Sequence, residues 1–113
     1  MPTKPTKPTL PIPDPESADA HVLDYEIDDY VTADRPEQLK ALGDPTRITI
    51  LTLLLERSAT TTHLAEALGK PKGTVGYHLK VLESAGLIRI VRTRPVRAMT
   101  EKYYGRTGRT IVY

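Results

Sequence analysis

The chain has 113 residues, a mass of 12.6 kDa and a formal net charge of +2, enough for one small domain with a modest core. It contains no Cys, Phe or Trp, and its only aromatic residues are six Tyr, so disulfides and thiolate metal sites are excluded and the core must be aliphatic. No apolar run approaches the roughly 20 residues that span a bilayer, and the N-terminal MPTKPTKPTLPIP lacks the apolar centre of a secretory signal.

Charges of opposite sign are separated along the chain. Between Asp14 and Asp44 there are ten acidic residues, opposed only by Arg35 and Lys40, whereas after Gly86 there are seven basic residues and one acidic residue. This separation favours a positive surface on the C-terminal half even though the total charge nearly cancels. Such a surface suits a polyanion.

The first 33 residues divide into a leader and an acidic arm. Residues 1–16 are rich in Pro, Thr and Lys, a composition that predicts polyproline II or disorder. An inert leader is favoured over a phosphate-binding tail that uses Lys4 and Lys7. In the arm, residues 17–33, Tyr25 and Ile27 alternate with acidic residues, which predicts a short strand or an extended segment.

Residues 34–113 are predicted to form the packed domain, which begins with two helices. Asp34 supplies an N-cap acceptor and Glu37 a carboxylate three residues later, the pattern of a capping box, for a short helix that stops at Gly43. Asp44-Pro45 is a second start signal. The helix that follows is predicted to be central. Its apolar stripe consists of Ile48, Leu51, Leu54 and Leu55, and Ile50 and Leu53 broaden it.

Two further helices are predicted around a tight turn. Thr60 is the expected N-cap of a helix over 61–68, which Gly69 ends, and Pro71 then stands in the first turn of a helix over 71–85. The spacing turns Val75, Leu79 and Leu82 inward and leaves the opposite face polar, with Lys72, Thr74, Tyr77 and Lys80. That face fits a recognition helix for the major groove. The alternative is a solvated face of an ordinary helix pair.

After Gly86 the pattern changes to two β-prone runs, 87–92 and 98–104, with residues 93–97 as a loop that turns at Pro95. The predicted fold class is therefore mainly α with a two-stranded antiparallel hairpin. Arginines gather on this hairpin, although clustered guanidinium groups repel one another, and phosphates or a narrow minor groove would attract them. The alternative is an edge kept soluble by charged residues.

Several segments together resemble the ArsR-type winged helix-turn-helix regulators of bacteria. Residues 41–48, ALGDPTRI, resemble the family's ALxDPTRL motif, and residues 73–82, GTVGYHLKVL, resemble its TVSxHLKxL recognition helix. The resemblance also includes residues 62–68 and 85–88, and it covers about 36–106. Residues 104–107 are similar to an actinobacterial subgroup. The resemblance implies a winged helix-turn-helix fold and a dimeric, cytoplasmic transcription factor of repressor type.

The resemblance also implies which residues bind double-stranded DNA. Base and groove contacts would come from the helix over 71–85, namely Thr74, Gly76, Tyr77, His78 and Lys80. The charges themselves, apart from the resemblance, make the basic residues of the preceding turn and of the wing over 87–104 the candidate anchors for phosphates or the minor groove, namely Lys70, Lys72, Arg92, Arg94, Arg97 and Arg106. Gly76 stands where the family usually has Ser, which removes a hydroxyl group, and Tyr77 could contact a thymine methyl or a phosphate. The alternative for His78 is a half-buried ring that fixes the helix through a hydrogen bond.

Neither a metal, nor a cofactor, nor catalysis is expected. The family's metal sensors use Cys on the first helix of the motif, and residues 60–68 contain none, while His21, His63 and His78 are too scattered for an evident ligand set. His63 is expected to be a surface residue. No nucleophile–base pair or phosphate loop is evident, and residues 105–108 are interpreted as the end of the wing.

A second function class remains open from the residues alone. A winged helix can serve as a protein-interaction module, with the basic wing docking an acidic partner or the chain's own acidic arm. Related to this is the hypothesis that residues 24–29 shield the wing when DNA is absent. Salt-sensitive binding to duplexes would favour the regulator over the interaction module.

Overall fold

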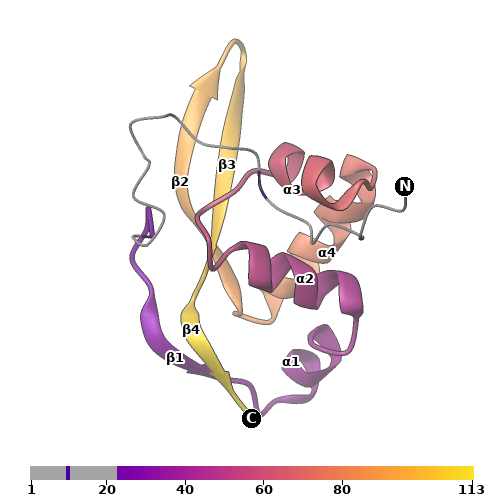
Figure 1. The fold of residues 1–113 in the computed structure, drawn as a ribbon, viewed down its shortest axis with the longest axis vertical. Coiled ribbons are helices and arrows are strands. Elements are labelled where there is room, and N and C mark those ends of the chain that lie inside the picture. Colours follow the sequence, from indigo (N-terminus) through magenta and orange to yellow (C-terminus); the bar gives the residue numbers. More distant parts are fainter. Residues whose placement is uncertain (1–9, 11–22) are drawn as a thin grey trace, which may run out of the picture.

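The computed structural model describes Leu10 and residues 23–113. The predictions for the leader (except at Leu10) and for residues 17–22 of the acidic arm fall on residues outside this description. In chain order the elements are β1 (Asp28–Thr32), α1 (Pro36–Ala41), α2 (Pro45–Leu53), α3 (Thr61–Leu68), α4 (Lys72–Ser84), β2 (Ile88–Val96), β3 (Met99–Arg106) and β4 (Gly108–Val112) (Figure 1).

The helices pack around α4, which contacts α1, α2, α3 and β2. Burying one large aliphatic side chain stabilises the fold by roughly 1.5–3 kcal/mol, and the core cluster is aliphatic, as the composition requires. Its largest members, each almost fully buried, are Ile50, Leu53, Leu54, Leu64, Val75, Leu79, Leu82, Leu87 and Ile88. The inward face predicted for α4 is confirmed.

Three of the predicted helix-end signals are confirmed. The Asp44 carboxylate accepts hydrogen bonds from the amides of Thr46 (2.8 Å) and Arg47 (3.2 Å) at the start of α2. Thr60 Oγ1 accepts from the amide of His63 (3.1 Å), and His63 Nδ1 accepts from the amide of Thr60 (3.3 Å). Gly69, at a φ of 64°, ends α3 in the left-handed conformation. Side-chain oxygens and a glycine therefore set these boundaries.

The start of α1 differs from the prediction. The N-cap is Arg35, not Asp34, and the side chain that returns to the helix start is Gln38, which accepts from the amides of Asp34 and Arg35 at 3.1 Å each. Glu37 lies instead 3.5 Å from the Arg35 guanidinium. Gln38 is buried, and its Nε2 donates to the carbonyl of Ala85 (3.2 Å). An ionised Glu cannot donate that hydrogen bond, so an amide at position 38 ties α1 to the end of α4.

The helix boundaries around α2 and α4 also correct two predictions. The buried face of α2 and its cap comprises Ile50, Leu51, Leu53 and Leu54, whereas Ile48 and Leu55 are 41% and 37% exposed. Because α2 ends at Leu53, Leu55 cannot extend a helical stripe. Pro71 is the N-cap of α4, with ψ at 147°, so the helix begins one residue later than expected.

The hairpin is longer than predicted, and residues 93–97 do not form its loop. Thr93, Arg94 and Pro95 pair with Lys102, Glu101 and Thr100, and the turn lies after Val96. Arg97 adopts a φ of 58° there, and this left-handed conformation allows a tight two-residue turn. Pro95 is tolerated because β2 pairs with β3 alone in the described sheet, which leaves its other edge without a partner strand.

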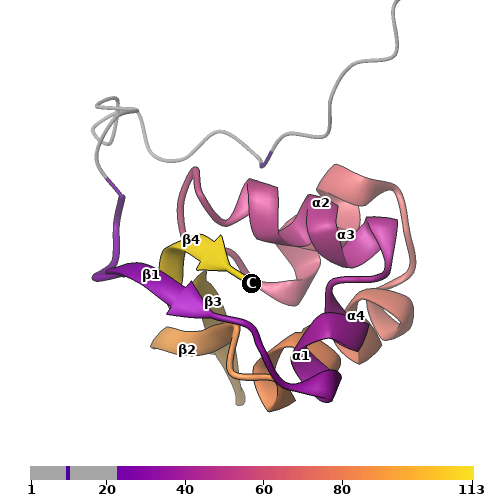
Figure 2. The ribbon, with the colours of Figure 1, turned by 90° about the horizontal axis from the view of Figure 1, so that it is seen from below.

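A second sheet, of β1 and β4, was not predicted. The two strands are parallel, with Asp28 opposite Gly108 and Thr32 opposite Val112 (Figure 2). A Cβ atom on Gly108 would lie 2.5 Å from the amide nitrogen of Val31, so only glycine permits this approach. The expected strand in the acidic arm is present but falls at Asp28–Thr32. Residues 105–108 therefore join two strands and do not simply end the wing.

The residues before β1 are attached to the domain by side chains. The Tyr25 hydroxyl donates to the carbonyl of Leu54 (2.6 Å) and accepts from the amide of Arg106 (3.0 Å). The Asp24 carboxylate accepts from the amide (2.7 Å) and hydroxyl (2.9 Å) of Ser58. This part of the arm is thus anchored beside the base of the hairpin. Within the described residues, no helix has the length and apolarity needed to cross a membrane.

Candidate nucleic-acid interface

The outward face of α4 has the composition and exposure that a groove-reading helix requires. Lys72, Thr74, Tyr77 and Lys80 are all exposed, Tyr77 by 63%. Residues 74, 77 and 80 stand three apart, so they share one side of the helix. Beside them Gly76 leaves open space where a Cβ would stand. Lys70 is exposed in the turn just before the helix.

His78 turns toward the domain. Arg47 Nη1 lies 3.1 Å from its Nδ1. A guanidinium can only donate, so Nδ1 is the acceptor in this contact. His78 is half-buried. It therefore joins α4 to α2. This matches the alternative given for His78 in the sequence analysis, a half-buried ring that fixes the helix through a hydrogen bond.

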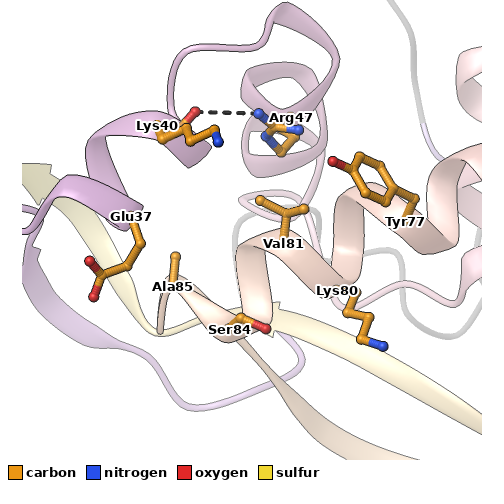
Figure 3. A pocket seen from close by; sticks show the side chains of 8 residues that line it. All are labelled: Glu37, Lys40, Arg47, Tyr77, Lys80, Val81, Ser84 and Ala85. Atoms are coloured by element: carbon orange, nitrogen blue, oxygen red, sulfur yellow. Dashed lines mark hydrogen bonds between the residues drawn. The ribbon is translucent and has the colours of Figure 1, made fainter.

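Arg47 is the centre of this connection and was missed in the sequence. It is buried, and besides the His78 contact its Nε donates to the carbonyl of Ala41 (2.7 Å) and its Nη2 to that of Lys40 (3.3 Å) (Figure 3). Those carbonyls lie at the end of α1, where a positive charge is favoured. Burial acts to raise the pKa of the neighbouring Asp44, but the hydrogen bonds from the amides of Arg47 and Thr46, together with the Arg47 charge, lower it.

The available signal for Arg47 was that it is the single charged residue of α2, whose inward side is aliphatic. A charged residue at such a position is buried only if polar groups from other elements meet it. Which groups do so depends on how α1 and α4 pack, and the sequence of α2 does not contain that information. Gln38 was missed for the same reason, because its partner is a backbone carbonyl 47 residues away.

The hairpin projects beyond the helices (Figure 1), and most of its arginines are already engaged. The Arg92 guanidinium lies 4.0 Å from the centre of the Tyr103 ring and 3.8 Å from the Asp24 carboxylate. Arg94 lies 3.5 Å from Glu101. Arg97, at the turn, is exposed and makes no side-chain hydrogen bond or ion pair within the described part of the chain.

Arg106 does not belong to the surface, contrary to its predicted role as a phosphate anchor. Its side chain is 6% exposed, and its nitrogens donate to the carbonyls of Gly108 (3.0 Å), Leu51 (3.2 Å) and Arg109 (2.8 Å). Burial lowers the pKa of this guanidinium, while the nearby Tyr25 acts to raise it. Arg106 fails as a surface residue because β4 folds back over the end of β3. It is a structural cation that joins α2 to the start of β4.

His63 lies at the interface of α3 and the hairpin. Its ring meets the Tyr103 ring edge-on, with centroids 5.8 Å apart, and it also closes the capping box with Thr60. It is half-buried, so it is not the surface residue that was expected. Among residues 23–113, no group of three His, Asp or Glu side chains could hold a metal ion.

Comparisons with known proteins agree with this geometry. The family described as "Bacterial regulatory protein, arsR family" matches residues 44–89, which contain α2, α3 and α4. An uncharacterised HTH-type transcriptional regulator of Methanocaldococcus jannaschii is 43% identical over 54 residues, which make up 47% of this chain and 61% of that protein. The HTH-type transcriptional regulator NmtR of Mycobacterium tuberculosis is 33% identical over 87 residues, 77% of this chain and 61% of that protein.

A similar fold occurs among solved structures. The homodimeric winged helix-turn-helix DNA-binding domain of a possible ArsR-family regulator from Mycobacterium bovis superposes with a TM-score of 0.50 at 30% identity. The match covers 61% of this chain and 59% of that one. The chain thus spans about three fifths of the length of the two curated relatives named above.

Proposed function

This chain contains a winged helix-turn-helix domain of the ArsR family, and we propose that it is a sequence-specific DNA-binding regulator of transcription. It acts as a repressor-type factor in the bacterial cytoplasm, by binding and without catalysis. None of the comparisons favours the alternative, a protein-interaction module.

The observation that carries the proposal is the exposed polar face of a rigidly held helix. Two polar contacts hold α4: the buried Gln38 amide donates to the carbonyl of Ala85, and Arg47 contacts the half-buried His78. A helix fixed in this way can present side chains to a major groove without a large loss of conformational freedom on binding. Thr74 and Tyr77 are the proposed base contacts.

The cations around this face supply affinity that does not depend on sequence. Lys70, Lys72 and Lys80 lie on α4 or just before it, and Arg94 and Arg97 extend the contact along the hairpin. Each contact with a phosphate releases counterions, so binding should weaken steeply as salt increases. Arg92 can contact a phosphate only when its ion pair with Asp24 is broken, and the buried Arg106 makes no contact with DNA.

The functional unit is proposed to be a homodimer. The similar domain from M. bovis was solved as a homodimer. In helix-turn-helix proteins, dimers place two recognition helices on half-sites about one helical turn apart. One such helix contacts too few base pairs to give the specificity that an operator requires.

Selection of binding sites from random duplexes, with the full chain, tests the proposal. On the selected and on a random duplex, Lys80→Ala should weaken binding by a similar factor and reduce the salt dependence by about one phosphate contact. Tyr77→Ala should cost about 1–3 kcal/mol on the selected duplex only. Arg109→Ala, an exposed cation on β4, is the control and should change neither. Equal effects of Tyr77→Ala on both duplexes, or no enriched sequence, would contradict the proposal.

A further inference from the structure

A hollow of about 320 Å³ lies between α1, the start of α2 and α4 (Figure 3). Val81 of α4 and Ala85, its C-cap, form an apolar part of the lining, and the Tyr77 ring faces Arg47 across the hollow. Lys40 enters from α1, and Lys80 stands at the rim. The volume is at the lower end of the range of small-molecule sites, about 300–1,000 Å³. It therefore suits a ligand about the size of one substituted ring.

The charges around the hollow are unbalanced in favour of cations. Lys40, Arg47 and Lys80 line it, with Glu37 as the only carboxylate among its lining residues. Glu37 lies 3.5 Å from Arg35, which is outside the lining, so its charge is already compensated. The lining therefore combines apolar and aromatic surface with an excess of positive charge.

Arg47 strengthens this inference because it is a buried cation whose neighbouring carboxylate, Asp44, accepts from the amides of Thr46 and Arg47 and forms no ion pair with the guanidinium. Its side chain is 9% exposed, and no carboxylate in the described part of the chain lies within salt-bridge distance. Its three nitrogens bond two carbonyls and one imidazole, which leaves one N–H on each terminal nitrogen. Buried charges are normally paired with an opposite charge. A carboxylate in the hollow would supply one.

We propose that this hollow binds a small organic anion, a carboxylate attached to an apolar or aromatic body, and that the bound anion competes with DNA. The carboxylate is held by Lys40 and the free N–H groups of Arg47, and the body packs on Val81, Ala85 and Tyr77. Tyr77 and Lys80 also belong to the proposed DNA-reading face, so the occupied site removes them from the groove. The binding step stands on the hollow alone, whereas the competition rests on the proposed function.

Titration of the ¹⁵N-labelled full chain tests the binding step, with benzoate as the probe and acetate and benzyl alcohol as comparators. Benzoate combines the ring and the charge, and each comparator lacks one of them. Up to about 20 mM, enough to saturate a site with a Kd on the order of 1 mM, benzoate should shift amide signals around Lys40, Arg47, Tyr77 and Val81 saturably. Each comparator should bind at least about tenfold more weakly.

Lys40→Gln is the matched variant. Lys40 is exposed, and its side chain makes no hydrogen bond or ion pair within the described residues, because Arg47 bonds only its backbone carbonyl. The fold should therefore persist while benzoate affinity falls about tenfold. Lys102→Gln, which removes an exposed charge on β3, should leave benzoate binding unchanged. No saturable shift, shifts spread over the surface, equal binding of the comparators, or equal effects of the two variants would overturn the site.

The competition is measured separately, with the selected duplex. Benzoate at saturation should raise the Kd for that duplex at least about fivefold, and it should have little effect on Lys40→Gln. Benzoate binding with unchanged DNA affinity would refute the competition. If no duplex is bound while benzoate still occupies the hollow, the proposed function fails and the ligand site does not.

Discussion

Two regions of the molecule, α4 and the hairpin, carry basic residues, but in the described part of the chain those on α4 are unpaired and most of those on the hairpin contact other residues. On α4, Lys72 and Lys80 are exposed and make no ion pair within residues 23–113. On the hairpin, Arg92 lies against Asp24 and Tyr103, and Arg94 lies beside Glu101. Charge density along the chain is higher on the hairpin, yet both lysines of α4 are unengaged, whereas among the hairpin's six cations only Arg97 and Lys102 make no side-chain hydrogen bond or ion pair within the described residues.

The difference shows that a run of basic residues does not by itself identify a binding surface. The acidic arm is far from the hairpin in sequence, but Tyr25 and β1 bring it to the hairpin base, where Arg89 also donates to the carbonyl of Glu26 (2.7 Å). Arg106, the last basic residue of β3, is buried, and each of its three side-chain nitrogens donates to a backbone carbonyl. Availability for DNA is decided by tertiary contacts, and four comparisons of variants or conditions test those contacts.

Arg106→Ala should have the largest effect, and that effect should be on folding. Three carbonyls would lose their partner, so the free energy of unfolding should fall by roughly 2–4 kcal/mol. Arg97→Ala, at the exposed turn, should stay within about 0.5 kcal/mol of the wild type while it weakens duplex binding. Urea unfolding of both variants measures this, and equal stabilities would show that Arg106 is not a structural cation.

Gly105→Ala and Gly73→Ala should change stability in opposite directions. A Cβ on Gly105 would lie 2.7 Å from the Tyr25 ring and would displace the tyrosine that anchors the arm, at a cost of roughly 1–3 kcal/mol. At Gly73, within α4, nothing lies within 4 Å of the added atom, and alanine should stabilise the helix by roughly 0.5–1 kcal/mol. Thermal unfolding distinguishes the two, and a neutral Gly105→Ala would mean that the arm is not anchored there.

Asp24→Asn should release Arg92 and strengthen duplex binding. The pair is partly exposed, at 53% and 38% of the two side chains, so the expected gain is only roughly two- to fivefold in Kd. Asp29→Asn makes the same change of charge on exposed β1, where Asp29 has no recorded ion pair among the described residues. If both variants raise the affinity for DNA equally at low salt, the gain comes from the change in net charge and not from the release of Arg92.

The smallest effect expected is a pH dependence that arises from His63. Burial lowers its pKa below the usual 6.5, and Glu101 only partly opposes this. The unfolded chain then binds a proton at a higher pH than the folded chain does, so the contribution to stability is complete above about 6.5 and is lost as the pH falls through the lower folded pKa. His63→Gln should flatten the profile of Tm between pH 7.5 and pH 5.5 (roughly one unit either side of the unperturbed pKa). An unchanged slope would assign the pH dependence to other groups.

Local signals in the sequence predicted much of the helical part. Asp44, Thr60 and Gly69 act on residues within a few positions, and the spacing of Val75, Leu79 and Leu82 alone fixes the inner face of α4. The change of period after Gly86 predicted the hairpin, and the family resemblance added the winged helix-turn-helix fold and the class of regulator.

What could not be predicted depends on contacts between distant segments. The pairing of β1 with β4 joins residues about 80 positions apart, as Asp28 with Gly108 shows, and no local pattern specifies a partner at that distance. The two-residue turn at Arg97 depends on a positive φ that arginine rarely adopts. The burial of Arg47 and Arg106 follows from carbonyls presented by other elements. Of the proposed site, the helix face was therefore predictable and the engaged arginines were not.

Amide shift mapping of the full chain with the selected duplex tests the central claim most directly. If the exposed face of α4 reads DNA, the largest changes on adding duplex should fall on residues 72–80, with a smaller set at Arg97, and β1 and β4 should change little. Changes centred on the β1–β4 sheet, or an unaffected α4, would contradict the account.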